Sequence, residues 1–205
     1  LAHFLHLQKD QRRDESGKPY DREVMIFPRY HQLQAVRMLT RDAREKGVGH
    51  NYLIEHSAGS GKSNTIGWLA HRLSTLHNAN NERIFDSVIV ITDRRVLDRQ
   101  LQDTVYQFEH KHGVIQKIDE DSQQLLKALE SSVPIIITTL QKFPFVTRHL
   151  VKRAEEQGTD DYALETRHVA VIVDEAHSSQ SGESSVELKG VLGGKELIES
   201  AEQKA

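Results

Sequence analysis

Short apolar runs recur along the chain and predict the strands of a buried sheet. The runs are rich in Val and Ile, and they lack the alternating polar positions of a strand that faces water on one side. We therefore expect both faces of these strands to be covered, as in a parallel sheet. The runs occupy residues 52–54, 88–91, 135–137 and 169–173.

Apolar residues at helical spacing lie between these runs. They predict helices over residues 64–76, 96–108 and 123–129. A further helix is expected over residues 30–46, because Pro28 precedes it and Gly47 follows it. Alternating strands and helices predict an α/β fold, a mostly parallel sheet with helices on both faces. In such folds ligands bind beyond the carboxyl ends of the strands.

Turn-forming residues and charged or polar stretches divide the chain into three parts. Residues 1–25 carry a charged stretch and a turn at Gly17, and we expect a lead-in segment such as the end of an upstream domain. Residues 26–190 hold every predicted strand and helix and form the expected domain. Residues 191–205 end in a polar stretch, so we expect a poorly ordered tail. Because the first residue is Leu1 and not Met, we expect a piece of a longer protein.

The composition excludes several classes of protein. The chain has 205 residues, with 27 Lys and Arg against 30 Asp and Glu, and no Cys. The net charge of -3 provides no global basic field, so any contact with nucleic acid must be local. The lack of Cys excludes disulfides and thiolate chemistry and suits a cytoplasmic protein. The 12 His residues are scattered without the spacing of a zinc site. No apolar run approaches the roughly 20 residues of a membrane helix, so we expect no membrane partner.

A loop of small residues lies between the first predicted strand and a predicted helix. Glycines at 59 and 61 let backbone N–H groups surround an anion, and the helix N-terminus adds its dipole. We expect Lys62 to reach the phosphates of a nucleotide and Ser63 to ligate Mg²⁺. His56 stands where the strict G-x-x-x-x-G-K-[ST] pattern has Gly, and the alternative is a flexible turn with a solvated lysine. The predicted nucleotide-binding residues of this loop are Ser57, Ala58, Gly59, Ser60, Gly61, Lys62, Ser63 and Asn64.

Two carboxylates follow the last predicted strand directly. Asp174 and Glu175 come after the run 169–173, at the sheet edge where ligands bind. We expect Asp174 to hold the Mg²⁺ shell and Glu175 to polarise an attacking water. The alternative is a solvated strand end, with Glu175 as a charge at a helix N-terminus. Together with the loop, the pair predicts nucleotide hydrolysis assisted by Mg²⁺.

These residues resemble the first RecA-like domain of superfamily-two helicases and translocases. That family has a relaxed phosphate loop, G-x-G-K-[ST], and an Asp-Glu-x-His box, which residues 174–177 match. Residues 29–32 are similar to the family's R-x-x-Q element. The resemblance implies that Arg29 and Gln32 contact the nucleotide, with Gln32 selecting ATP through its adenine. It also implies that His177 relays between the nucleotide pocket and the nucleic acid.

Two further loops resemble the family's nucleic-acid contacts. One follows the run at 88–91 and the other follows the run at 135–137. For the arginines of the first loop, a solvated helix face is the alternative. The resemblance implies contacts to the DNA backbone from Arg94, Arg95, Thr138, Thr139 and Lys142.

A closer resemblance, over residues 27–182, is to the motor domain of the R subunit of type I restriction enzymes. It includes His56 and the residues after the Asp-Glu-x-His box. The resemblance implies ATP-driven translocation of duplex DNA, with methyltransferase and specificity subunits as partners. We find no Thr-Ala-Thr-like motif, no second RecA-like domain with its arginine finger and no nuclease centre. We therefore expect those parts in a longer protein, and weak ATP hydrolysis from these 205 residues alone.

Three other functions stay open at this point. Another superfamily-two motor, such as a type III restriction subunit or a remodelling helicase, shares the core motifs. A P-loop phosphotransferase needs a lid and an acceptor pocket that the sequence does not reveal, and it leaves Gln32 and the Asp-Glu-x-His box unexplained. A non-catalytic DNA- or partner-binding module would be indifferent to the substitution Lys62→Ala.

Overall fold

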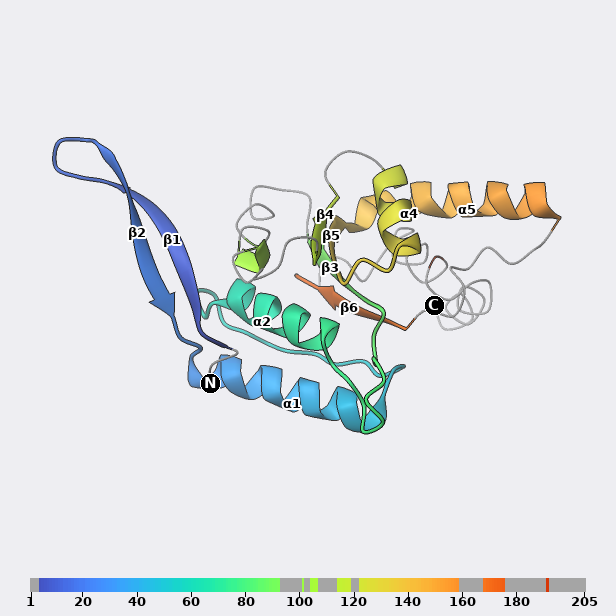
Figure 1. Cartoon of the computed structure of the whole chain (residues 1–205), viewed down its shortest axis with the longest axis horizontal. Helices are drawn as coiled ribbons and strands as arrows, with labels where there is room; N and C mark the ends of the chain where they lie inside the picture. Colours follow the sequence, from blue (N-terminus) through green and yellow to red (C-terminus); the bar gives the residue numbers. More distant parts are fainter. Residues whose placement is uncertain are drawn as a thin grey trace.

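A four-stranded parallel sheet forms the centre of the protein (Figure 1). The computed structural model describes residues 4–92, 101, 104–106, 114–118, 122–158, 168–175 and 191. The order of the strands across the sheet is β4, β5, β3, β6. Their bounds are β3 Ser87–Thr92, β4 Ile115–Lys117, β5 Ile135–Thr139 and β6 Val169–Val173.

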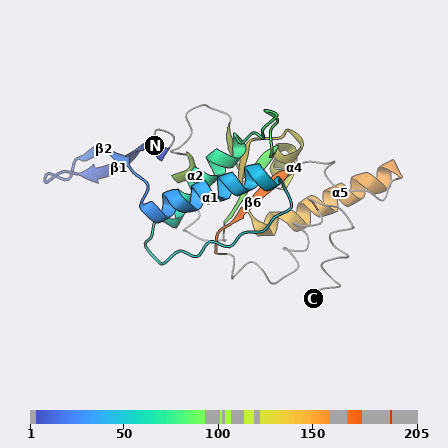
Figure 2. The ribbon, with the colours of Figure 1, turned by 90° about the horizontal axis from the view of Figure 1, so that it is seen from below.

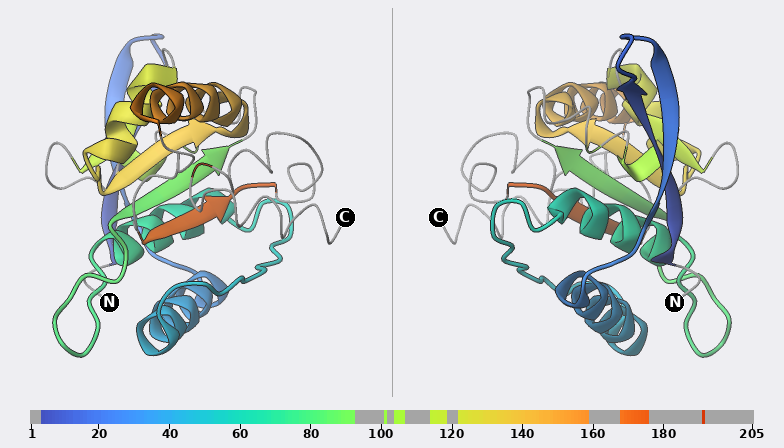
Figure 3. Two further views of the ribbon diagram at one scale, coloured as in Figure 1. Left: turned by 90° about the vertical axis from the view of Figure 1, so that its right-hand side faces the viewer. Right: turned by 90° about the vertical axis from the view of Figure 1, so that its left-hand side faces the viewer.

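Helices cover both faces of this sheet (Figure 3). Helix α2 (Lys62–Ser74) lies on one face, and α1 (Tyr30–Lys46) packs against α2. Helices α4 (Ser122–Glu130) and α5 (Phe143–Gln157) lie on the other face. The predicted α/β class, with a mostly parallel sheet between two helical layers, is confirmed.

Alternate residues of β3 belong to two different cores. Val88 and Val90 pack with the fully covered Trp68 of α2, whereas Ile89 and Ile91 pack with α4 and α5. Every residue of β3 is buried, as the uninterrupted apolar run predicts. Strand β6 is the edge strand of the described sheet, and its Val171 remains 36% exposed.

Most predicted helices are found, and several elements were not predicted. Helix α1 has the predicted bounds, α2 begins two residues earlier than expected, and α4 extends the expected range by one residue at each end. The helix expected over 96–108 falls largely outside the described residues, although residues 101 and 104–106 are helical. Strand β4, helix α5 and the short 3₁₀ turn Leu140–Lys142 were not predicted.

The strand expected over residues 52–54 is wrong. The segment is extended but joins no sheet in the described part of the chain, and Leu53 is 73% exposed. The physical reason is a side-chain contact that holds the segment beside α1: the hydroxyl of Tyr52 donates a 2.5 Å hydrogen bond to Asp42 of that helix. The segment therefore follows α1 on its way to the phosphate loop, and its backbone is not paired to the edge strand β6.

The expected lead-in segment is an antiparallel hairpin, β1 (His6–Arg13) with β2 (Pro19–Ile26), which projects from the domain (Figures 1 and 2). Asp14 closes its turn by accepting 2.9 Å hydrogen bonds from the backbone N–H groups of Ser16 and Lys18. Phe4 is buried, and its ring centroid lies 6.3 Å from that of Trp68. Phe4, just before the hairpin, thus packs against the core of the domain, and the boundary expected at residue 26 stays a prediction.

At the other end, Val191 is fully buried in the core between the sheet and α4 and α5. The rest of the expected tail, residues 192–205, lies outside the described residues. Among the helices that the structure describes, none has the length and apolar character needed to cross a membrane.

Candidate nucleotide-binding site

The phosphate loop lies at the N-terminus of α2, as the sequence predicts. Gly59 and Gly61 both have left-handed backbones, with φ of 72° and 84°, and Gly61 is the N-cap of the helix. The N–H of Ser60 donates to the carbonyl of Ser57 at 3.2 Å, which closes the loop. The first N–H groups of a helix have no acceptor within it. The loop therefore offers these donors and the positive end of the helix dipole to an anion.

Gln32 of α1 anchors this loop from the side. Its Nε2 donates to the carbonyls of Ser60 at 3.2 Å and Gly61 at 2.8 Å, and its Oε1 accepts from the N–H of Arg29 at 2.7 Å. The contact is so close that a Cβ on Gly61 would lie 2.5 Å from Gln32 Nε2. Gln32 is only 3% exposed. Residue 61 must therefore be Gly for two reasons, its backbone conformation and its neighbour.

This anchoring was not foreseen, because residues 29–32 were interpreted through their resemblance to an adenine-reading element. A signal was present, since a Gln three residues after an N-cap position is the spacing of a capping box. Arg29 also contacts the loop, with Nη1 donating to the carbonyl of Gly59 at 3.4 Å. In this conformation Arg29 and Gln32, both predicted to contact the nucleotide, are directed to the backbone of the phosphate loop.

The structure brings the two predicted carboxylates to the phosphate loop. The N–H of Asp174, just after β6, donates to the carbonyl of Ile91 at 2.9 Å, which fixes its position at the carboxyl edge of the sheet. Lys62 Nζ lies 2.5 Å from Glu175 Oε1 and 3.9 Å from Asp174 Oδ1. The hydrogen bond to Glu175, with the charges of both carboxylates, raises the pKa of Lys62 above its usual value, although partial burial opposes this.

Glu175 has a left-handed backbone, with φ of 51°. Its N–H donates to its neighbour Asp174 at Oδ1, over 3.0 Å. For a residue with a Cβ this conformation costs on the order of 1–3 kcal/mol and is found mainly at functional sites. The turn directs the Glu175 side chain back toward Lys62, which places a carboxylate where a phosphate chain would meet the lysine.

The predicted Mg²⁺ site rests on Ser63, in the first turn of α2, and Asp174. A hydroxyl and a carboxylate fit Mg²⁺, which takes oxygen ligands and is usually held by one or two carboxylates together with substrate phosphates. Within the described ranges no group of three or more His, Asp or Glu could hold a metal ion. A hydroxyl and one carboxylate therefore suit an ion that is bound together with the phosphates of a nucleotide.

The residues predicted to contact DNA are less accessible than expected. Thr138 is 2% exposed, and Lys142 donates a 2.6 Å hydrogen bond from Nζ to the carbonyl of Ile118 at the end of β4. The side chain of Thr138 is therefore covered and that of Lys142 is hydrogen-bonded within the domain, while Thr139 is half-buried. The predicted residues Arg94, Arg95 and His177 lie outside the described residues.

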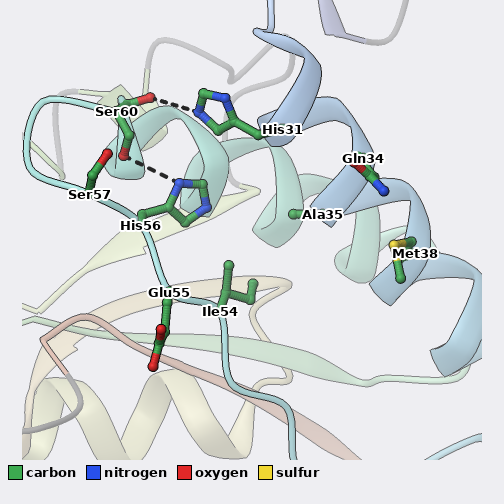
Figure 4. Close-up of a pocket in the computed structure, with 9 residues that line it drawn as sticks. All are labelled: His31, Gln34, Ala35, Met38, Ile54, Glu55, His56, Ser57 and Ser60. Atoms are coloured by element: carbon green, nitrogen blue, oxygen red, sulfur yellow. Dashed lines mark hydrogen bonds between the residues drawn. The ribbon is translucent and has the colours of Figure 1, made fainter.

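Two histidines flank the loop, and sequence analysis assigned them no role (Figure 4). His31 Nε2 lies 3.3 Å from the carbonyl oxygen of Ser60, and His56 Nδ1 lies 3.3 Å from its Oγ. The two rings are 5.5 Å apart and meet edge to face. Burial lowers the pKa of His56, and the neighbouring His31 and Lys62 lower it further. His56 is therefore neutral at neutral pH.

Comparison with known protein families matches residues 31–199 to the SWI2/SNF2 ATPases. The chain belongs to this family, and its α/β sheet with a phosphate loop and an acidic strand end is that of a helicase-like ATPase domain.

Among curated proteins, the chain is similar to endonuclease subunits of type I restriction enzymes. It is 28% identical over 160 residues to the SsaAORF53P subunit of Staphylococcus saprophyticus, covering 78% of this chain and 15% of that protein. It is 30% identical over 172 residues to the HindI subunit of Haemophilus influenzae, covering 83% of this chain and 15% of that protein. The chain thus spans about 15% of the length of these relatives. No solved structure matches it.

Proposed function

We propose that this chain is the ATP-binding half of a motor that translocates duplex DNA, within the R subunit of a type I restriction-modification system. The observation that carries the proposal is the contact of Lys62 with Glu175 and its approach to Asp174. The lysine of the phosphate loop and the two adjacent carboxylates after β6 come from two separate parts of the fold, and nucleotide hydrolysis in this proposal uses all three. The likeness to type I restriction endonuclease subunits supports the choice of motor.

In this proposal the residues act in a definite order. The N–H groups of residues 59 and 61–63 and the Lys62 ammonium bind the phosphates of ATP, and Ser63 and Asp174 hold Mg²⁺. Mg²⁺ supplies charge neutralisation on the phosphates. Glu175 is bound to Lys62 at 2.5 Å before the nucleotide arrives, so it must release the lysine. Once released, its carboxylate orients a water for attack on the terminal phosphorus and accepts its proton, while the bond from that phosphorus to the bridging oxygen breaks and ADP leaves.

The remaining parts of the motor lie beyond the phosphate site. A second RecA-like domain of the longer protein supplies an arginine that stabilises the transition-state charge. Arg94, Arg95 and Thr139 contact the DNA backbone, and His177 couples that contact to the nucleotide. Methyltransferase and specificity subunits bring the motor to its DNA in the cytoplasm.

The test is ATP hydrolysis by the full chain that contains this domain, with and without long duplex DNA. We expect DNA to stimulate hydrolysis, Glu175→Gln to abolish hydrolysis while ATP still binds, and Lys62→Ala to abolish binding. The matched control is Glu45→Gln, an exposed residue of α1, which leaves both unchanged. Hydrolysis that is indifferent to DNA, or transfer of phosphate to a small acceptor, would assign the domain to a phosphotransferase. A Lys62→Ala variant with unchanged activity would leave only a binding module.

A further inference from the structure

The polar atoms of Ser60 are all in hydrogen-bond contact with residues in or beside the phosphate loop (Figure 4). Its N–H donates to the carbonyl of Ser57 at 3.2 Å. Its carbonyl accepts from Nε2 of Gln32 at 3.2 Å, and Nε2 of His31 lies 3.3 Å from the same oxygen. Its Oγ lies 3.3 Å from Nδ1 of His56. Ser60 is only 7% exposed, so it holds the shape of the loop and leaves phosphate to the N–H groups of its neighbours.

The contact between His56 and Ser60 lies within the loop itself. The two residues are four positions apart, and the imidazole reaches across the bend by which the chain enters the loop (Figure 4). The strict phosphate-loop pattern has Gly where this chain has His56. A glycine has no side chain with which to reach Ser60. The loop of this chain therefore has a hydrogen bond across its own bend that a loop of the strict pattern cannot form from this position.

We propose that His56 is a positioning residue for phosphate binding: its Nδ1 holds Oγ of Ser60 and thereby keeps the loop in the shape that receives an anion. The proposal rests on the proposed function and adds a residue to the same site. An anion binds such a loop when several N–H groups point to one centre. Holding Ser60 by its hydroxyl as well as by its carbonyl restricts the loop to that arrangement. His56 acts through Ser60 and does not itself contact the phosphate.

The other nitrogen of the ring shows that packing alone does not account for a histidine here. His56 Nε2 is buried and has no hydrogen-bond partner among the residues that the structure describes. A buried polar atom without a partner destabilises a fold. A leucine would fill a similar volume without this cost, but it would lose the contact with Ser60. The loss of His56 should therefore appear in phosphate affinity more than in the stability of the fold.

The contact does not depend on a positive charge. Burial lowers the pKa of His56, and the neighbouring His31 and Lys62 lower it further, so the ring is neutral at neutral pH. Either neutral tautomer keeps the contact, because Nδ1 donates to Oγ of Ser60 in one and accepts from it in the other. Asparagine also has a donor and an acceptor, and it does not titrate. It should therefore replace His56 in this role, whereas leucine should not.

The experiment measures the affinity of the full chain for inorganic tripolyphosphate with Mg²⁺ by calorimetry, and the thermal unfolding of each variant. The variants are His56→Leu, His56→Asn, Ser60→Ala and the double variant His56→Leu with Ser60→Ala. The control is His50→Leu, the same substitution at an exposed position six residues earlier. Steady-state hydrolysis of ATP in the presence of long duplex DNA then separates KM from kcat for the same proteins.

We expect His56→Leu and Ser60→Ala each to weaken tripolyphosphate about three- to tenfold, the scale of one hydrogen bond. The carbonyl of Ser60 keeps its bond to Gln32, so the loop is loosened and not lost. The double variant should bind no more weakly than His56→Leu, because both changes remove one contact. His56→Asn and the control His50→Leu should bind as the unaltered chain does. In hydrolysis, the weakened variants should show a raised KM and an unchanged kcat.

Four results would overturn the positioning role. These are unchanged affinity in His56→Leu, additive losses in the double variant, a loss in His56→Asn as large as that in His56→Leu, and a fall in kcat without a change in KM. If His56→Leu does not fold, Ser60→Ala removes the same contact, and unchanged affinity there overturns the proposal. If the unaltered chain binds neither tripolyphosphate nor ATP, the proposed function itself fails, and the positioning role fails with it.

Discussion

Two glycines of the phosphate loop provide a sharp test of how the loop is held. Gly59 and Gly61 both have left-handed backbones, with φ of 72° and 84°. A Cβ on Gly59 would meet nothing within 4 Å, whereas a Cβ on Gly61 would lie 2.5 Å from Nε2 of Gln32. The substitutions Gly59→Ala and Gly61→Ala therefore share the cost of a left-handed backbone, and only Gly61→Ala also brings a clash with Gln32.

The magnitudes follow from the two effects. A left-handed backbone costs an alanine about 1–2 kcal/mol, so Gly59→Ala should lower the free energy of unfolding by that amount. Gly61→Ala also displaces Gln32, which donates to Ser60 at 3.2 Å and to Gly61 at 2.8 Å. Each such hydrogen bond contributes about 0.5–1.5 kcal/mol. The expected loss for Gly61→Ala is therefore about 2–5 kcal/mol in total.

Urea unfolding followed by the fluorescence of Trp68, the single tryptophan of the chain, measures both losses. A double-mutant cycle with Gln32→Ala isolates the second effect, because the Gly61→Ala loss should fall to that of Gly59→Ala once Gln32 is shortened. The reasoning is refuted if Gly61→Ala and Gly59→Ala are equally destabilising, or if the Gly61→Ala loss is the same with and without Gln32.

Three further predictions concern titration and packing. Because burial lowers the pKa of His56 below its usual 6.5, the unfolded chain binds more protons as the pH falls. The free energy of unfolding should thus decrease below about pH 6.5, and His56→Asn should flatten this dependence in urea titrations at several pH values. The pKa of Lys62 is raised in the folded chain, so its charge stabilises the fold at pH values below the usual pKa of 10.5, and this stabilisation is lost as the pH rises through the higher folded pKa. In unfolding measurements at alkaline pH, Lys62→Met should remove this loss of stability. A pH dependence that is unchanged in the variant would contradict the ion pair. Ile136→Ala, at a fully buried position, should destabilise by about 2–5 kcal/mol, and Val171→Ala, at 36% exposure, by about 1 kcal/mol or less; thermal unfolding that ranks them equally would contradict the assigned cores.

The sheet, and the approach of the two carboxylates after its last strand to Lys62, were predictable from local sequence patterns. An apolar run such as 88–91 has no polar face, and only a strand covered on both sides accommodates it. The topology then places Asp174, at the end of β6, beside Lys62, at the start of α2.

The parts that sequence missed depend on long-range choices. Residues 52–54 have the composition of a strand, but the segment runs along α1, where Leu53 is exposed. The hydrogen bond from the hydroxyl of Tyr52 to Asp42 is formed on this path. Helix α5 was overlooked because residues 138–143 were interpreted as a DNA-contact loop, although Pro144 near its start was a helix signal.

The placement of hydrogen-bond donors explains why α1 matters to a site on α2. Three successive carbonyls of the loop, those of residues 59–61, accept from side chains of Arg29, His31 and Gln32. Carbonyl and N–H groups of one peptide point in opposite directions, so fixing the carbonyls toward α1 turns the N–H groups of the following residues away from it. The beginning of α1 thus prepares the loop for an anion before any arrives. A substitution there should act on phosphate affinity through the loop, without contact between the altered side chain and the nucleotide.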